Sequence, residues 1–291
     1  MKRFKEALES GEFVVTAECG PPKGTDLHEM IENIKSIKGK VNAINATDNQ
    51  SAVMRVSSMA ICKIILDMGI EPIFQLTCRD RNRLAIQSDL LGADVLGIKN
   101  LLSLTGDYVS TGDHKEAKPV FDIESVQLLQ VVETLNSGID MAGNRLTGPT
   151  DIFAGATVTP ESDPIEPQLL KFEKKIKAGA KFFQTQAIYD IEAFKKFMEY
   201  TRGLHVSVLA GILLLKSAGM ANYLNRNVPG IRVPDELITE LKEAGKEKAS
   251  ETGIDIAVRT IKGVKDYCSG VHIMAIGAED KIPEIIDRAG L

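Results

Sequence analysis

The sequence predicts a single (β/α)8 barrel, the TIM barrel, an α/β fold in which eight parallel strands alternate with helices. Apolar stretches of strand length alternate with segments of helical periodicity along the whole chain, and eight such strands are found. No linker interrupts this alternation, so residues 1–291 are expected to form one domain. The alternative, an open doubly wound sheet, is disfavoured because no G-x-G-x-x-G motif follows the first strand.

The expected strands are short apolar stretches that end in polar or turn-forming residues. They cover residues 13–19, 41–46, 72–76, 101–104, 152–158, 181–186, 205–215 and 270–276. In the first of them, Val14, Val15 and Thr16 favour a strand, and Pro21-Pro22 cannot extend a ladder. Glu18 is therefore expected at the carboxyl end of this strand, the end where parallel barrels bind ligands.

The segments between the strands carry apolar residues at helical spacing. The expected helices cover residues 1–9, 25–38, 57–68, 82–91, 123–135, 167–178, 191–201, 217–225, 254–267 and 283–289, and residues 233–236 open another. Asp122 is expected to cap the helix at 123–135. Residues 136–151, rich in Gly, Asn, Pro and Thr, are expected to form a long connection.

Composition argues against several classes of protein. The net charge of −5 and the aromatic content of 5% give no indication of nucleic-acid binding. The apolar runs fall short of the roughly 20 residues that span a bilayer, and the first residues suit an amphipathic helix better than a signal core. The four cysteines are widely spaced and histidine is scarce, so neither a disulfide framework nor a metal site is expected. We expect a soluble cytoplasmic protein without membrane insertion.

The expected strand ends would bring acids and amides together at one rim of the barrel. Glu18 and Asp107 are two carboxylates that we expect to face one cavity, where burial helps a carboxyl group to hold a proton, as a general acid must. The set contains no histidine, which disfavours metal hydrolase and Ser-His-Asp sites. The histidines are expected away from the strand ends: His28, His114, His205 and His272.

Each of these residues also has a purely structural interpretation. Thr105-Gly106-Asp107 is an ordinary turn signal, and Gln186 is placed to bond a neighbouring loop. Lys174 and Lys175 have the character of a solvated helix face. Cys19 has no basic neighbour in sequence and is expected to pack in the core.

Six short motifs, in order, resemble the methylenetetrahydrofolate reductase family over about residues 4–290. They are Glu18 with Pro21-Pro22, Gln75-Leu76-Thr77-Cys78, Leu104-Thr105-Gly106-Asp107, Lys174-Lys175 with Ala178-Gly179-Ala180, Thr185-Gln186, and Ala210-Gly211-Ile212-Leu213. Each motif alone is weak, but their order and separation make the match specific. The chain looks most similar to the bacterial flavoprotein type found in anaerobic, acetogen-like organisms.

This resemblance implies a flavoenzyme of one-carbon metabolism and methionine biosynthesis that reduces 5,10-methylenetetrahydrofolate to 5-methyltetrahydrofolate. Glu18 would be the general acid that protonates folate N10 and opens the ring to a 5-iminium cation, which takes hydride from reduced flavin. Asp107 would stabilise this cation by its charge. Gln186, Thr47 and Lys216 would bind the folate.

The resemblance also implies a flavin, FAD or FMN, and no metal. The residues that would line the flavin are Ala46, Thr47, Gln75, Thr105, Gly106, Asp107, Gly155, Ala156, Lys171, Lys174 and Lys175. NAD(P)H or a partner electron-donor protein would supply electrons, and a second reductase subunit and a homo-oligomer are further expected partners.

The chain departs from the pattern of the family in places that leave the flavin and the electron donor open. The departures are Cys19-Gly20, Gln75, Thr105, Leu214 and Lys216-Ser217-Ala218. Two alternatives therefore stand beside the reductase. One is a folate- and flavin-binding subunit that needs a partner for electron input. The other is an unrelated barrel lyase that uses Glu18 and Lys216 on a phosphorylated substrate.

Overall fold

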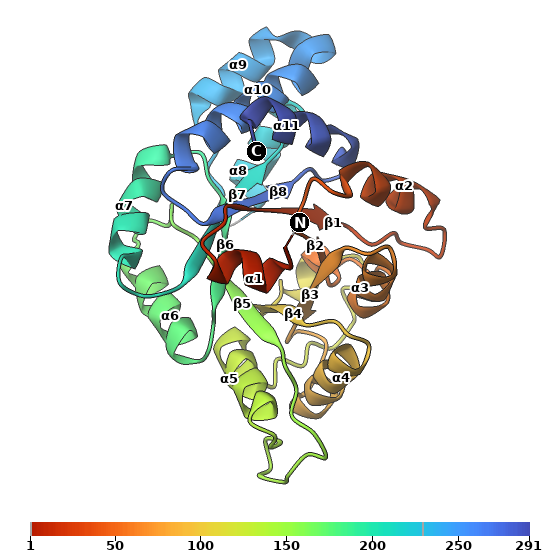
Figure 1. The fold of residues 1–291 in the computed structure, drawn as a ribbon. Coiled ribbons are helices and arrows are strands. Elements are labelled where there is room, and N and C mark those ends of the chain that lie inside the picture. The colour runs from red at the N-terminus through yellow and green to blue at the C-terminus, as the bar shows by residue number, and fades with distance from the viewer. Residues whose placement is uncertain (1, 229) are drawn as a thin grey trace.

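Eight parallel strands close into a barrel in chain order, and helices cover its outside (Figure 1). The structure is a computed structural model that describes residues 2–228 and 230–291. The strands are β1 (Val14–Cys19), β2 (Ala43–Ala46), β3 (Glu71–Thr77), β4 (Asn100–Leu104), β5 (Phe153–Val158), β6 (Phe182–Ala187), β7 (Ser207–Leu213) and β8 (Gly270–Met274). The predicted (β/α)8 barrel is confirmed, because β1 pairs with both β2 and β8 and so closes the sheet.

The helices follow the strands as expected. They are α1 (Phe4–Glu9), α2 (His28–Ile37), α3 (Ser58–Asp67), α4 (Arg83–Val95), α5 (Ser125–Asn136), α6 (Glu166–Lys177), α7 (Ile191–Thr201), α8 (Ala218–Asn227), α9 (Asp235–Glu243), α10 (Gly245–Val264) and α11 (Ile282–Ala289). Short 3-10 turns are η1 (Gln50–Ala52), η2 (Val109–Thr111) and η3 (Glu279–Lys281). Met1, the first residue of the first expected helix, lies outside the described residues.

Two helices extend well beyond their expected bounds, and one expected cap was wrong. The helix expected at 254–267 begins at Gly245, because its first two turns are mostly polar and exposed and so carry little apolar periodicity. The helix expected at 82–91 continues to Val95. Glu124, not Asp122, caps α5: its side chain accepts from the Val126 N–H in a capping box, whereas Asp122 pairs with Arg83.

The end of the barrel at the amino termini of the strands is filled by apolar side chains, and α1 lies across that end (Figure 1). The Phe4 ring meets the Phe182 ring edge-on with centroids 5.0 Å apart. Gly155 faces the same ring, where an added Cβ would come within 2.4 Å of it. Because this end is closed, the opposite rim, at the carboxyl ends of the strands, is the one open to ligands. Within the described residues, no helix is long and apolar enough to cross a bilayer.

Candidate functional site

Above the apolar layer, the barrel interior becomes polar. Buried Thr16, Asn45, Gln184 and His272 come from β1, β2, β6 and β8. The Asn45 and Gln184 amides bond each other reciprocally, with N···O distances of 2.7 and 3.0 Å. His272 Nδ1 lies 3.0 Å from Thr16 Oγ1 and 3.4 Å from Gln184 Nε2. These four residues, which we call the polar floor, support the rim directly above them.

Glu18 lies on β1 two residues beyond Thr16, so both side chains point to the same face of the strand. Its side chain is only 11% exposed. Gln50 Nε2 donates to its Oε1 at 3.2 Å, and Gln75 Nε2 donates to its Oε2 at 3.3 Å. His272 Nε2 lies 3.7 Å from Oε2. Nitrogen atoms from three separate segments therefore surround the carboxyl group.

His272 lies away from the end of its strand, as expected, but it nevertheless lines the pocket beside Glu18. It is an interior residue of β8, 3% exposed, and the closure of the barrel places β8 beside β1. The alternation of His272 with buried Val271 and Ile273 is the sequence signal that could have identified an inward-facing strand position.

A pocket of about 400 Å³ opens above this region, within the usual size range of small-molecule sites. Glu18 and Asp107 both line it, as expected. The other expected site residues that line it are Gln75, Thr105, Gly106, Lys171, Lys175 and Gln186. The pocket therefore brings together both acids, both amides and two of the four lysines that were singled out from the sequence.

The segment that carries Gln50 is fixed over the pocket by an unusual backbone. Asn49, Ser51 and Ala52 all have positive φ, between 46° and 57°, a region that residues other than glycine seldom occupy. The Ser51 N–H donates to Asp107 Oδ2 at 3.1 Å. Asp107 therefore holds this segment in place and, through it, Gln50 above Glu18.

Arg79 is a pocket residue that the sequence did not indicate. Its side chain is 2% exposed and pairs with Asp80 at 2.7 Å. Its guanidinium also donates to the Asn49 carbonyl at 3.3 Å and to the Asp107 carbonyl at 3.5 Å. One buried cation thus ties the loops after β2, β3 and β4 together, which no pattern within a single segment could reveal.

Two lysines of α6, one turn apart, supply positive charge on the β5 side of the pocket. Lys175 is 7% exposed and its Nζ donates to the Thr157 carbonyl at 2.6 Å. Burial, together with the nearby Lys171 ammonium, lowers the pKa of Lys175 to about 8. The solvated-face interpretation was thus wrong for Lys175 and right for Lys174, which is exposed and does not line the pocket.

The remaining expected residues lie outside the pocket lining. Ala46, Gly155 and Ala156 belong to the barrel wall. Thr47 is 1% exposed, and its hydroxyl is a buried group with no hydrogen-bond partner among the described residues. Lys216 Nζ donates to the Ile276 carbonyl at 2.5 Å and is not among the residues that line this pocket.

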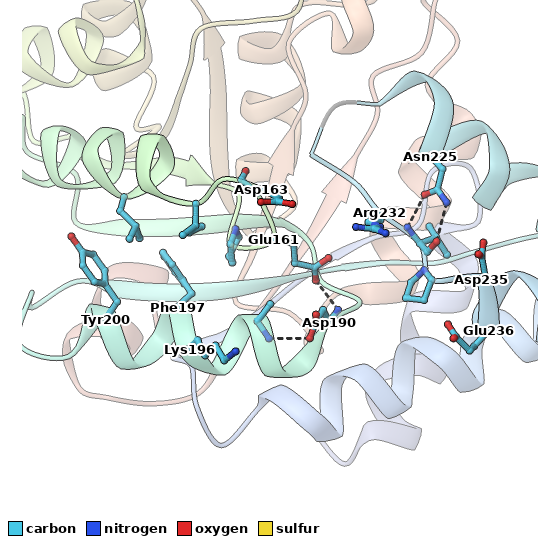
Figure 2. A pocket seen from close by; sticks show the side chains of 17 residues that line it. Glu161, Asp163, Asp190, Lys196, Phe197, Tyr200, Asn225, Arg232, Asp235 and Glu236 are labelled. Carbon is cyan, nitrogen blue, oxygen red and sulfur yellow. Dashed lines mark hydrogen bonds between the residues drawn. The ribbon is translucent and has the colours of Figure 1, made fainter.

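A larger pocket, of about 900 Å³, lies beside α7 and the connection between α8 and α9 (Figure 2). Its half-buried acid, Glu161, accepts the backbone N–H groups of Tyr189 and Asp190 at 2.6 and 2.8 Å, and partial burial raises its pKa. Asn225 similarly bonds both backbone groups of Val233. These polar groups bond the protein itself, so we place the site at the barrel mouth. In the part of the chain that the structure describes, no cluster of His, Cys, Asp or Glu could hold a metal ion.

The fold and the pocket define a class of protein: a (β/α)8 barrel with a binding site at its mouth. In that site, side-chain nitrogens surround one carboxyl group, and two lysines supply positive charge. A model of the methylenetetrahydrofolate reductase family matches residues 3–290. The chain therefore belongs to the methylenetetrahydrofolate reductase family, a family of oxidoreductases.

Individual relatives are distant. The 5,10-methylenetetrahydrofolate reductase of Pectobacterium carotovorum subsp. carotovorum is 26% identical over 280 residues, which cover 88% of this chain and 85% of that protein. Methylenetetrahydrofolate reductase 2 of Schizosaccharomyces pombe is 27% identical over 239 residues, 74% of this chain. The match covers only 35% of that yeast protein.

Solved structures share the fold. A protein from Clostridium thermocellum, described as binding two copies of 5-methyl-5,6,7,8-tetrahydrofolic acid, superposes with a TM-score of 0.70 at 17% identity and covers 98% of this chain and 96% of its own. EDTA monooxygenase from Chelativorans sp. BNC1 has a TM-score of 0.57 at 10% identity, with 96% of this chain and 93% of its own covered.

Proposed function

We propose that this protein catalyses the flavin-dependent reduction of 5,10-methylenetetrahydrofolate to 5-methyltetrahydrofolate. Membership of the family supports this proposal. The observation that carries it is the placement of Glu18 in the pocket, with side-chain nitrogens directed at both of its oxygens. The Clostridium protein of the same fold is described as binding the product named here.

In this proposal Glu18 is the general acid that protonates N10 of the folate and opens its five-membered ring. The Gln50 and Gln75 amides hold the carboxyl group in one orientation at the rim. They also stabilise the carboxylate that remains once the proton has been given to the substrate.

Asp107 supplies the negative charge that stabilises the 5-iminium cation formed by ring opening. It lines the same pocket as Glu18, and the Ser51 N–H and the buried Arg79 hold it in place. Gln186, also at the pocket wall, is proposed to hydrogen-bond the folate.

The residues present fit a flavin. Lys171 and Lys175 give the pocket positive charge suited to a phosphate. Gly106, with φ of +95°, leaves the rim free of a side chain. When bound, the flavin, FAD or FMN, supplies the hydride. Gln75 and Thr105, which line the pocket, are proposed to line the flavin.

The electron donor is proposed to be NAD(P)H or a partner protein, and the alternative of a subunit that depends on a partner remains. The lyase alternative loses support because Lys216 does not line the pocket with Glu18.

The experiment is to purify the chain, record its visible absorption spectrum, and titrate it with FMN and FAD. The protein loaded with the preferred flavin is then reduced chemically without oxygen and mixed with 5,10-methylenetetrahydrofolate. We expect the oxidised flavin spectrum to return and 5-methyltetrahydrofolate to appear. A colourless chain that binds neither flavin would refute the proposal. Reoxidation by folate without reduction by NADH or NADPH would favour the partner-dependent subunit.

A further inference from the structure

We propose that His272 is a positioning residue for Glu18: the polar floor fixes its neutral tautomer with the proton on Nε2, which then donates to the Glu18 carboxylate. This inference rests on the proposed function, because it concerns the group that gives its proton to the folate.

The tautomer follows from the groups that face Nδ1. The Gln184 amide nitrogen has two hydrogens: one is donated to Asn45 Oδ1 at 3.0 Å, and the other faces Thr16 Oγ1 and His272 Nδ1, at 3.3 and 3.4 Å. Thr16 Oγ1 accepts this second hydrogen, and its own proton is assigned to Nδ1, 3.0 Å away, because that contact is shorter than the 3.4 Å to the Val271 carbonyl. Nδ1 is then the acceptor of the Thr16 hydroxyl, and Nε2 carries the hydrogen.

The role of His272 follows from the group that its Nε2 atom faces. It faces Glu18 Oε2 at 3.7 Å, a separation that a small movement of the acid would shorten into a hydrogen bond, as often happens when a catalytic site binds its substrate. With Gln50 and Gln75, His272 completes three neutral donors around one carboxyl group. A donor favours the charged form, so His272 eases the release of the proton to the substrate.

The effect on pH dependence has a defined sign. Protonated Glu18 is needed for ring opening, so the rate falls where Glu18 loses its proton. Removing a donor disfavours the carboxylate, so the fall moves to higher pH. The other ionisable groups in the barrel mouth are Asp48, Arg79, Asp107, Lys171 and Lys175. Those lining the second cavity that Glu18 borders, of about 350 Å³, are Cys19, Asp26, Glu29, Arg55 and Glu279. All of them are the same in the variants compared.

Two substitutions distinguish the role of His272 as a donor to Glu18 from its role as a member of the polar floor. His272→Asn keeps a polar group at the level of Nδ1, facing Thr16 and Gln184, but does not reach Glu18. His272→Gln keeps a nitrogen donor that reaches the position of Nε2. In single-turnover oxidation of the reduced holoenzyme by 5,10-methylenetetrahydrofolate, we expect His272→Asn to slow the reaction about 10- to 100-fold and to move its high-pH fall upward. His272→Gln should restore the rate and the pH profile toward those of the unaltered enzyme, with flavin affinity unchanged in both.

The tautomer is measured directly on the unaltered holoenzyme by nitrogen-15 NMR, with the His272 signals assigned by their loss in His272→Asn. We expect a protonated Nε2 and an unprotonated Nδ1 at neutral pH. A protonated Nδ1, or equal rates and pH profiles in the Asn and Gln variants, would overturn the inference even in a working enzyme. Absence of the folate reaction in the unaltered chain would instead refute the proposed function, whatever the tautomer.

Discussion

Lys175 allows a quantitative test of how the barrel mouth is built. Its pKa is lowered from 10.5 to about 8, mainly by burial and further by the Lys171 ammonium. Between these two values the unfolded chain holds a proton that the folded chain lacks, so stability rises as pH increases through this window. At about 1.4 kcal/mol per pH unit, the lowered pKa corresponds to about 3 kcal/mol of folding free energy that is absent below pH 8.

The perturbation is Lys175→Met, with the exposed neighbour Lys174→Met as the matched control. Urea unfolding of the three chains at a series of pH values from 7 to 10.5 gives the free energy of unfolding of each. Buried cysteines such as Cys19, whose pKa is raised to about 12, add the opposite trend above pH 9, but they are common to all three chains. The difference between chains therefore isolates Lys175.

We expect the free energy of unfolding of the unaltered chain to gain about 3 kcal/mol relative to Lys175→Met as pH rises from 8 to 10.5. Lys174→Met should follow the unaltered chain. The same pH dependence in all three would refute the burial argument. Binding of a phosphate such as that of FMN near Lys175 should also favour its charged form, so calorimetry near pH 8 should detect proton uptake on binding.

Three other substitutions test separate parts of the structure. Glu18→Gln should leave reduction of the flavin by its donor near normal and slow folate reduction about 100- to 10,000-fold; equal loss in both half-reactions would contradict the role of a general acid. Gly155→Ala should lower the free energy of unfolding by about 1–3 kcal/mol, because its Cβ would meet the Phe182 ring. Gly148→Ala, with open space around it, should leave the free energy of unfolding unchanged. Equal unfolding curves for the two variants would contradict the close contact between Gly155 and Phe182. Lys216→Met should leave folate turnover nearly unchanged, since its ammonium bonds the Ile276 carbonyl; a large fall in turnover would show that it reaches the substrate.

The fold could be predicted from local signals, because each strand of this barrel is a short apolar run with its own turn residues. Glu18 and Asp107 could be found for the same reason: each lies at a recognisable strand end. The beginning of α10 at Gly245 could not, since its exposed first turns obey no apolar period.

The groups that complete the site depend on contacts between distant segments. His272 lies 254 positions from Glu18 and comes close only because β8 pairs with β1. Arg79 follows an ordinary strand end, and only its burial against the loops bearing Asn49 and Asp107 gives it a role. These neighbours could not be predicted, because they are brought together only when the barrel closes and the loops pack. The sequence could identify Glu18, but not the residues that surround it.

The central claim is that Glu18 delivers a proton to a folate in this pocket. The most direct test is a single turnover without oxygen, in which the flavin-loaded and reduced chain meets 5,10-methylenetetrahydrofolate and the 5-methyltetrahydrofolate formed is quantified. We expect one product per reduced flavin in the unaltered chain and a rate at least about 100-fold lower in Glu18→Gln. Product formation at equal rates in the two chains would contradict the account.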